Sequence, residues 1–334
     1  MVSSCMLGKR SSLSCMSAAQ EADGRQCESR IKQSKRWICS KWTDWDSFFA
    51  PYIYHLLGHL AKKGELVVIM DGSEVGRGCC ALMLSAVWKG YAIPVVWTAR
   101  KGPKGHFPDQ MHTDLAALLW QLLSTLHPCR VVLLGDGEFD GPLLREWCQS
   151  RGWEYVLRTS LDRQVDCGGE SARIDTLLPL IGRGGHIFLQ YGCGASHAIL
   201  WRKKGFEDPI PLLTNIDLGA MACKYYKRRF KIETLFRQLK SAGFQLHKSM
   251  VGCSERIQKL LIVVAMAFIF TFCIGIIVKK QPCQLVVGFL RFDRMQTMGC
   301  ITVAQKALDA QSDLAYYIFS MLTKNFHDFL ANGS

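Results

Sequence analysis

An α/β fold is predicted by the order of the apolar runs and helical patterns in the sequence. Four apolar runs are typical of strands and two amphipathic patterns of helices, in the order strand, strand, strand, helix, strand, helix. The first and fourth strands each end in an aspartate before a glycine, and a third acid lies on a later helix. This is the element order of the ribonuclease H fold, so we expect a mixed sheet flanked by helices.

Size and charge narrow the class of protein. The chain has 334 residues, of which 49% are apolar, enough for one large domain or two modest ones and too apolar for a disordered protein. Its net charge of +13 favours nucleic acid or an anionic membrane surface as partner, because a field of one sign attracts such ligands. The 15 cysteines include no CxxC pair, and no long apolar run opens the chain, so we expect reduced thiols and a cytoplasmic protein.

The amino-terminal part is expected to contribute one packing helix. Residues 1–36 are basic and have little apolar periodicity, which predicts a poorly ordered or truncated region; a mobile arm that touches nucleic acid is the alternative. In residues 37–62, aromatic and aliphatic side chains recur at helical spacing. A helix that packs on the core is predicted there.

The main domain is predicted over residues 63–280 and begins with a meander. Its first strand, 65–71, ends at Asp71, and the runs 79–88 and 91–100 are separated only by a short turn, which predicts antiparallel pairing. A Leu-rich amphipathic helix, a strand ending at Asp136, and a second helix follow, at residues 108–126, 129–136 and 141–151. The glycine-punctuated strand-like runs at about 153–216 predict a β-rich insertion inside this domain.

One cationic helix is predicted over residues 226–240. At about 100° per residue, Tyr226, Arg229, Glu233 and Lys240 fall within roughly 60° of one another, beside an apolar stripe. A plain intrahelical ion pair between Arg229 and Glu233, which are spaced i,i+4, is the simpler interpretation. The two aspartates at strand ends favour a catalytic one.

The remaining chain is predicted to be helical. Residues 260–278 are almost uncharged and long enough to span a bilayer, so a membrane anchor competes with a buried core helix. We favour the core helix, and no membrane as partner, because small residues within the run permit close packing and no second hydrophobic segment exists. Residues 281–334 predict further helices.

Three carboxylates held by two strand ends and a helix suit catalysis at phosphorus. They can hold two divalent cations at roughly 4 Å separation, one to activate the attacking oxygen and one to stabilise the leaving oxygen. Oxygen ligands favour Mg²⁺, with Mn²⁺ as a substitute. We therefore predict Asp71, Asp136 and Glu233 as catalytic residues and metal ligands. An aspartate before glycine is also a common turn former, and Glu74, Glu138 and Asp140 compete with the two aspartates.

The cations near Glu233 predict a nucleic-acid surface. Arg229 is placed to orient the carboxylate or a phosphate, Lys240 to contact a neighbouring phosphate, and Tyr226 to stack on a displaced base. Arg228 and Arg237 widen this surface, and few acids balance it. A solvated helix face is the alternative.

These residues resemble a known signature. The spacing Tyr226-x2-Arg229-x3-Glu233-x6-Lys240 is similar to the Tyr-Arg-Glu-Lys signature of a large family of bacterial insertion-sequence transposases with a DDE catalytic domain. Asp71 and Asp136 resemble that family's two aspartates, and residues 213–215 resemble a segment found before its signature helix. The likeness covers roughly residues 65–275.

The resemblance implies a DNA transposase. Its expected activity is Mg²⁺-dependent strand cleavage at the ends of a mobile element, then attack of a 3′-hydroxyl on target DNA, by a homodimer in a synaptic complex within a bacterial cell. Two departures count against full activity: Gly137 stands where relatives often have Arg, and only about seventy residues precede Asp71, too few for the usual end-binding domain. A catalytically inactive DNA-binding remnant or repressor is the alternative.

Overall fold

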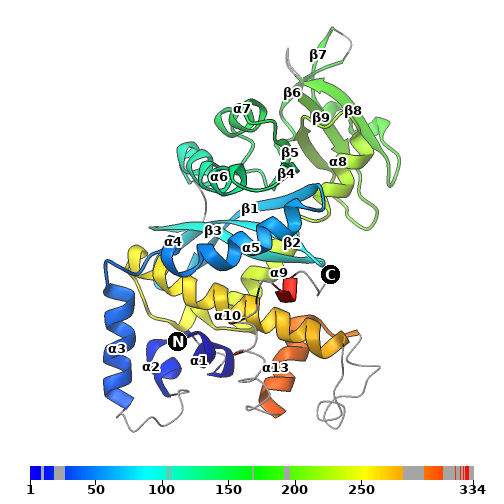
Figure 1. Cartoon of the computed structure of the whole chain (residues 1–334). Coiled ribbons are helices and arrows are strands. Elements are labelled where there is room, and N and C mark those ends of the chain that lie inside the picture. The colour runs from blue at the N-terminus through cyan, green and yellow to red at the C-terminus, as the bar shows by residue number, and fades with distance from the viewer. Residues whose placement is uncertain are drawn as a thin grey trace.

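The computed structural model of this chain describes most of its 334 residues. These are residues 1–8, 11–18, 27–103, 105, 107–167, 169–191, 196–280, 297–310, 320, 324, 326 and 328–330. Figure 1 shows a central sheet, with helices on both sides and a β-rich lobe at one end.

The centre of the chain is a mixed ten-stranded sheet. Its order is β3-β2-β1-β4-β5-β10-β9-β8-β6-β7. The first three strands pair antiparallel, and β1, β4 and β5 run parallel to one another. This half of the sheet confirms the predicted ribonuclease H-like core, whose strands are β1 (Glu65–Val75), β2 (Cys79–Trp88), β3 (Tyr91–Lys101), β4 (Arg130–Gly135) and β5 (Glu154–Arg158).

The insertion extends this same sheet. Strand β10 pairs antiparallel with β5, so the inserted strands continue the hydrogen-bonded ladder of the core. We expected residues 153–216 to be inserted, but β5 within this range pairs parallel with β4 and is the core's fifth strand. The inserted elements are β6 (Gln164–Asp166), β7 (Ser171–Arg173), a 3-10 helix (Ile174–Leu180), β8 (His186–Tyr191), β9 (Ser196–Trp201) and β10 (Ile210–Thr214).

Helices cover the sheet on two sides. In Figure 1, α6 (Asp109–Ser124) and α7 (Pro142–Ser150) lie above the core strands, and α9 (Lys231–Arg237) and α10 (Ser254–Lys280) lie below them. Both faces of β1, β2 and β4 are therefore buried, which explains why these strands are apolar runs without alternation.

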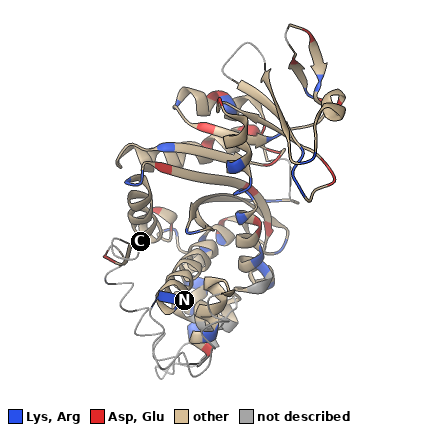
Figure 2. Cartoon of the chain, turned by 90° about the vertical axis from the view of Figure 1, so that its right-hand side faces the viewer, with Lys and Arg blue, Asp and Glu red and all other residues tan. Residues whose placement is uncertain are grey.

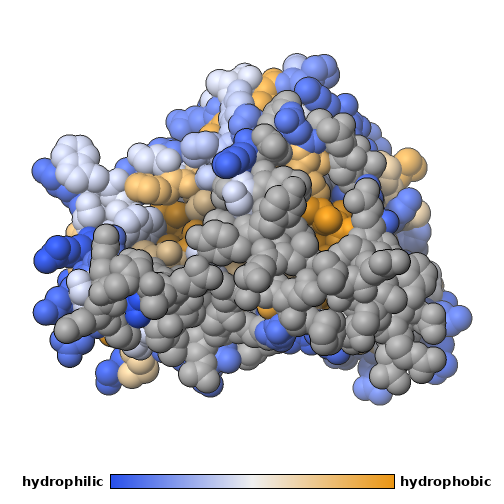
Figure 3. All heavy atoms as spheres, turned by 60° about the horizontal axis from the view of Figure 1, so that its bottom comes forward, coloured by the Kyte–Doolittle hydropathy of each residue, from blue (hydrophilic) through white to orange (hydrophobic). Residues whose placement is uncertain are grey.

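The long apolar segment is a core helix. Helix α10 has the length and composition of a membrane span, but 94% of its most apolar window is buried inside the chain. It packs on β3 and β2 on one side and on α1 (Val2–Gly8) and α13 (Cys300–Ala310) on the other. Seen from that second side, hydrophobic atoms fill the middle of the face and hydrophilic ones its edges (Figure 3).

The amino-terminal region differs from our expectation. The described part of residues 1–36 is helical, because α1, α2 (Leu13–Ala18) and α3 (Cys27–Cys39) lie beside α10 and bury Cys5, Met6 and Met16. A helix that is apolar all round needs such a cover on the side away from the sheet.

The packing helix predicted over 37–62 is divided in two. A break at residues 40–44 separates α3 from α4 (Trp45–Phe48), whose first turn is capped by the Asp44 carboxylate, and α5 (Ala50–Ala61) follows with Pro51 in its first turn. Of the predicted carboxy-terminal helices, α13 is present, whereas residues 281–296 lie outside the described residues.

Candidate active site

The sheet register places the two predicted aspartates level with each other. Strands β1 and β4 pair in parallel from Glu65↔Arg130 to Ile69↔Leu134. Continuing this register by two residues brings Asp136 opposite Asp71. Neighbouring strands lie about 4.8 Å apart, and residues level on parallel strands point to the same face of a sheet. The two carboxylates thus belong to one site at the point where β4 ends.

Asp71 itself lies inside a strand. We predicted that the first strand ends at Asp71, but β1 continues to Val75 because β2 pairs with it as far as Cys79. Asp71 is 3% exposed, and its Oδ1 accepts a hydrogen bond from the Gly72 amide at 2.7 Å. A Cβ on Gly72 would stand 2.8 Å from the Phe107 ring, so a side chain there would collide with the wall of the site.

Arg229 connects the first aspartate with the glutamate. Its Nη1 lies 3.7 Å from Asp71 Oδ2, and its Nη2 donates to Glu233 Oε1 at 2.5 Å. The Arg229 side chain is 8% exposed, whereas that of Glu233 is 53% exposed. Burial alone would lower the pKa of Arg229, but Tyr226, Glu233, Asp71 and Asp136 around it raise that pKa above its ordinary value. One guanidinium therefore neutralises charge in a cluster of acids.

The signature does not lie on one continuous helix, as we predicted. Helix α8 (Gly219–Tyr226) ends at Tyr226, and hydrogen bonds from residue i to i−3 carry the chain to α9. A π-helical turn, Gln238–Ala242, follows α9 at once. The tight turn and the wide turn change the angular position of each residue after them. The 60° sector derived from an ideal helix is therefore wrong, although Arg229 and Glu233 still meet.

The other signature residues have different surroundings. Tyr226 is 1% exposed, so its ring is part of the core in this structure and is not presented to a base. Lys240 is half-buried in the π-helical turn, and its carbonyl oxygen lies 2.6 Å from His247 Nδ1. Arg237 is exposed at the end of α9. Contact of these three residues with DNA remains a prediction.

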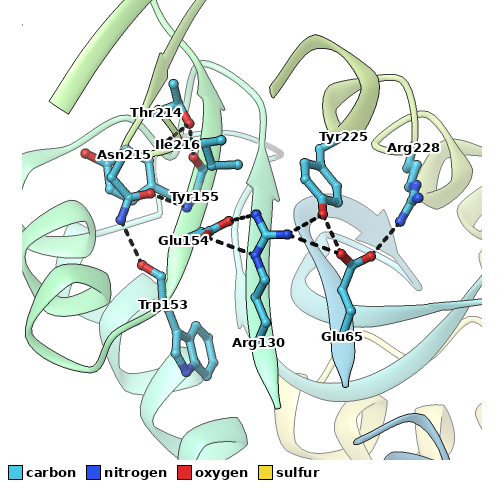
Figure 4. Close-up of polar contacts among 10 residues, drawn as sticks. All are labelled: Glu65, Arg130, Trp153, Glu154, Tyr155, Thr214, Asn215, Ile216, Tyr225 and Arg228. Carbon is cyan, nitrogen blue, oxygen red and sulfur yellow. Dashed lines mark hydrogen bonds and ion pairs between the residues drawn. The ribbon is translucent and has the colours of Figure 1, made fainter. Parts of the chain in front are cut away.

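Arg228 points away from the carboxylates. Its Nη1 lies 3.2 Å from Oε1 of Glu65, the first residue of β1 (Figure 4). Glu65 also accepts a hydrogen bond from the Tyr225 hydroxyl, which in turn accepts one from Arg130 at 3.0 Å. Arg130 forms a two-pronged pair with Glu154 on the next strand. This network joins α8 to the starts of β1, β4 and β5, at the end of the strands opposite Asp71.

The segment before α8 is tied to the core strand β5. The Asn215 side chain accepts from the Tyr155 amide at 2.8 Å and donates to the Trp153 carbonyl at 3.0 Å, and the Thr214 hydroxyl donates to the Tyr155 carbonyl at 2.7 Å (Figure 4). These contacts give residues 214 and 215 a structural role in fixing where α8 begins.

The competing acids are engaged elsewhere or turned away. Asp140 is ion-paired with Arg163 and accepts from the Thr159 hydroxyl, and Glu138 accepts from the Phe107 amide at 2.8 Å. Glu74 is exposed on β1, with an odd-residue offset from Asp71 that puts it on the opposite face of the sheet. Asp136 remains the acid that is level with Asp71.

The carboxylates do not form a ready metal site in this conformation. Within the described residues, no group of three or more His, Cys, Asp or Glu side chains stands close enough to hold one ion. The oxygen donors fit Mg²⁺ in type. Two of them are level on neighbouring strands, while Arg229 holds the third.

His112 is a site neighbour that sequence reasoning missed. It is 1% exposed on α6, its ring lies 4.8 Å from that of Phe139, and its Nε2 has no hydrogen-bond partner. Burial lowers its pKa, although the acids Glu138, Asp109 and Asp136 act against that shift. Its place on the inner side of the 108–126 helix was the one available signal.

Basic residues are spread over the chain. Figure 2 shows Lys and Arg on the sheet, its insertion and the helices. Exposed ones near the signature include Lys224, Lys227 and Lys231.

No family model matches this sequence, and no curated protein matches it. Among solved structures, the chain is similar to a piggyBac transposase synaptic complex with hairpin DNA, at 11% identity and a TM-score of 0.41, over 92% of this chain and 65% of that one. It is also similar to human ENDOV, at 16% identity and a TM-score of 0.30, over 53% and 86% of the two chains. For Argonaute from Aquifex aeolicus the values are 14% and 0.26, over 59% and 28%.

Proposed function

We propose that this chain is a DNA transposase of a bacterial insertion sequence. The observation that carries the proposal is the parallel register that puts Asp71 and Asp136 side by side, with Arg229 connecting Asp71 to Glu233. A ribonuclease H-like sheet with acids at this point suits cleavage and transfer of DNA strands. The spacing of Tyr226, Arg229, Glu233 and Lys240 favours the insertion-sequence family over other nucleases of this fold.

In this proposal Asp71, Asp136 and Glu233 hold Mg²⁺ ions, for which Mn²⁺ substitutes. When bound, such ions lower the pKa of an attacking water or hydroxyl and stabilise the leaving oxygen. Arg229 releases Glu233 toward the ions and keeps its contact with Asp71, which neutralises charge while no metal or phosphate is present. Its buried Nε has no partner and is a donor available to a phosphate oxygen.

DNA is the proposed partner, as both element end and target. The net charge of +13 and the exposed cations beside α9 support this choice. A homodimer in a synaptic complex follows from the family resemblance, and the solved structure of the piggyBac transposase is such a complex with hairpin DNA.

Strand cleavage in the presence of Mn²⁺ tests the proposal. The substrate is a supercoiled plasmid that carries the DNA flanking the coding sequence on both sides, and nicking is measured on gels. We expect nicking by wild type, and a loss of at least a hundredfold in Asp71→Asn, Asp136→Asn and Glu233→Gln. Nicking that survives in all three variants would reject the site.

The competing acids supply matched controls. Glu74→Gln changes an exposed acid on the same strand as Asp71, and Glu138→Gln changes an acid two residues from Asp136. Both should keep nicking within about threefold of wild type, provided that the variants fold. If Glu138→Gln abolishes nicking while Asp136→Asn does not, the second acid of the site is Glu138.

The structure favours one second candidate function, that of a catalytically inactive DNA-binding protein. The observation is that Arg229 occupies the space between Asp71 and Glu233, and no three-acid group forms within the described residues. Calorimetry with Mn²⁺ and a pre-cut duplex oligonucleotide separates the two functions. Metal binding that Asp136→Asn abolishes supports the transposase; DNA binding without metal binding supports the inactive protein.

A further inference from the structure

The loop between β9 and β10 encloses a basic pocket outside the carboxylate site. The pocket has a volume of about 680 Å³ and is lined by Arg183 and residues 202–207. Its frame is fixed by backbone hydrogen bonds, from the Gly184 amide to the Arg202 carbonyl at 2.8 Å and from the Arg202 amide to the Gly185 carbonyl at 3.0 Å. Gly184 and Gly205 adopt φ of +86° and +84°, values that side chains disfavour. The cations therefore line a folded cavity and not an extended tail.

The lining carries an unbalanced positive charge. Four cations and one carboxylate, that of Glu207, face the pocket. Within the described part of the chain, none of these cations is ion-paired with an acid; Arg202 instead donates to the Ile181 carbonyl at 3.1 Å. Burial, and then the neighbouring Lys227, lower the pKa of Lys203, which shows that its charge lacks a counter-ion. An anion in this cavity would supply one.

Aromatic rings alternate with these cations. The Lys203 Nζ lies 3.7 Å from the ring centroid of Phe206 and 4.7 Å from that of Phe230, and the Lys227 Nζ lies 5.5 Å from that of Trp201. Phe206 is 47% exposed. Cations that follow a backbone together with exposed rings on which bases or sugars stack are the pattern of single-strand binding.

The pocket is connected to the candidate active site through one ring. Phe230 has the Lys203 ammonium 4.7 Å from its centroid and the Arg229 guanidinium at the same distance of 4.7 Å. Arg229 in turn contacts Asp71 and Glu233. A strand that runs from the carboxylates past Phe230 would reach the pocket without crossing another element of the core.

We infer that this pocket binds the sugar-phosphate backbone of a DNA strand, in single-stranded form, next to the segment that enters the active site. The inference rests on the proposed function for the identity of the ligand as DNA. Its cations would hold two or more consecutive phosphates, and Phe206 would stack on the base or sugar between them. Such a site would hold the strand end in place during strand transfer.

The test is metal-free binding of a fluorescent 20-nucleotide single strand, followed by anisotropy in EDTA over a series of salt concentrations. In Arg183→Ala/Lys204→Ala, both exposed positions lose their charge. We expect affinity to fall at least tenfold at 0.1 M salt, and the slope of log K against log salt to fall by about 1 to 2, as for one or two lost phosphate contacts. Phe206→Ala should weaken single-strand binding more than duplex binding.

Lys35→Ala/Lys306→Ala is the charge-matched control. These exposed cations lie on α3 and α13, at the end of the molecule away from the insertion (Figure 1). The control should bind within about twofold of wild type, and circular dichroism checks that both double variants fold. Equal loss in both would mean that only the total charge counts, and wild-type affinity and slope in Arg183→Ala/Lys204→Ala would also overturn the inference.

The outcomes separate this inference from the proposed function. A chain that never nicks DNA, but loses single-strand affinity specifically in the pocket variants, rejects the transposase and leaves the binding site. Metal-dependent nicking combined with undiminished affinity in the pocket variants leaves the transposase and rejects the site. Tripolyphosphate that displaces the oligonucleotide from wild type at low concentration would show that isolated phosphates suffice, and would reject recognition of a strand.

Discussion

Arg229 and Asp71 form a buried ion pair whose Nη1 and Oδ2 atoms are 3.7 Å apart, and the two side chains are 8% and 4% exposed. The pair joins the segment after α8 to the middle of β1. The aspartate has one further hydrogen bond, from the Gly72 amide, so loss of the guanidinium would leave a buried carboxylate with little compensation. The pair thus links the stability of the fold to the arrangement of the site.

Arg229→Ala is expected to destabilise the chain strongly. Breaking a buried pair by removing one partner costs about 3 to 5 kcal/mol of unfolding free energy, because the remaining charge is uncompensated. Urea unfolding at pH 7 measures the effect. The control is Arg173→Ala, which breaks an ion pair with Asp175 whose side chains are 52% and 32% exposed, and should cost less than about 1 kcal/mol. Adding Asp71→Asn to Arg229→Ala should recover part of the loss, and equal effects of the two single variants would contradict the burial argument.

His112→Phe should reduce the sensitivity of the fold to acid. Burial lowers the pKa of His112 in the folded chain below 6.5, so the unfolded chain binds the proton first, and stability falls as the pH drops below about 6.5. Phenylalanine keeps the packing against Phe139 and removes only a ring nitrogen without a partner. Unfolding free energies at pH 7 and pH 5 give the comparison.

For this comparison we expect the difference between the two pH values to be smaller in His112→Phe than in wild type. The acids Glu138, Asp109 and Asp136 oppose the shift, and their own titration contributes mainly at lower pH. His127→Phe, at an exposed position, is the control and should leave the difference unchanged. An unaltered difference in His112→Phe would mean that His112 is protonated in the folded chain without cost.

The contact between α10 and α13 depends on a glycine. A Cβ on Gly275 would lie 2.1 Å from the Cys300 carbonyl oxygen, so any side chain forces two backbones apart. Gly275→Ala should lower the unfolding free energy by about 1 to 3 kcal/mol, as overpacking does. Gly58→Ala in α5 is the matched control: its Cβ would meet Leu126 at 3.5 Å, an ordinary contact, and should stabilise by about 0.5 to 1 kcal/mol. Melting temperatures that shift in the same direction would contradict this difference in packing.

The core of the fold and the aspartates could be predicted because their signals are local. An apolar run buried on both faces, ending in an acid before glycine, identifies β1 and β4 with Asp71 and Asp136. The continuation of β1 beyond Asp71 could not be predicted, because it depends on pairing with β2. Strand β5 looked like part of the insertion for the same reason: only its partner β4 assigns it to the core.

The course of the signature segment was beyond the reach of periodicity. Residues 227 and 230 keep helical φ and ψ, so the sequence has no breaker there, yet the hydrogen bonds change from i−4 to i−3 and later to a π turn. These changes send Arg228 to Glu65 and Arg229 to Asp71, although an ideal helix would place both on one cationic surface. Pairing partners so distant in sequence are tertiary information.

Arg228 and Lys231 should therefore differ in DNA binding, although both belong to the same basic segment. Arg228 is held by Glu65 at 3.2 Å, and its guanidinium lies 5.2 Å from the centroid of Tyr225, whereas Lys231 is exposed on α9. A cation already neutralised by an acid releases few counterions when DNA binds, so Lys231→Ala should reduce the slope of log K against log salt by about 0.9 and Arg228→Ala by less than half of that. Anisotropy with a duplex oligonucleotide in EDTA measures both slopes. Arg228→Ala should instead lower stability by breaking the contact between α8 and β1, which urea unfolding detects. A larger slope change in Arg228→Ala than in Lys231→Ala would show that DNA opens the Glu65 pair and recruits the arginine, as the sequence alone predicted.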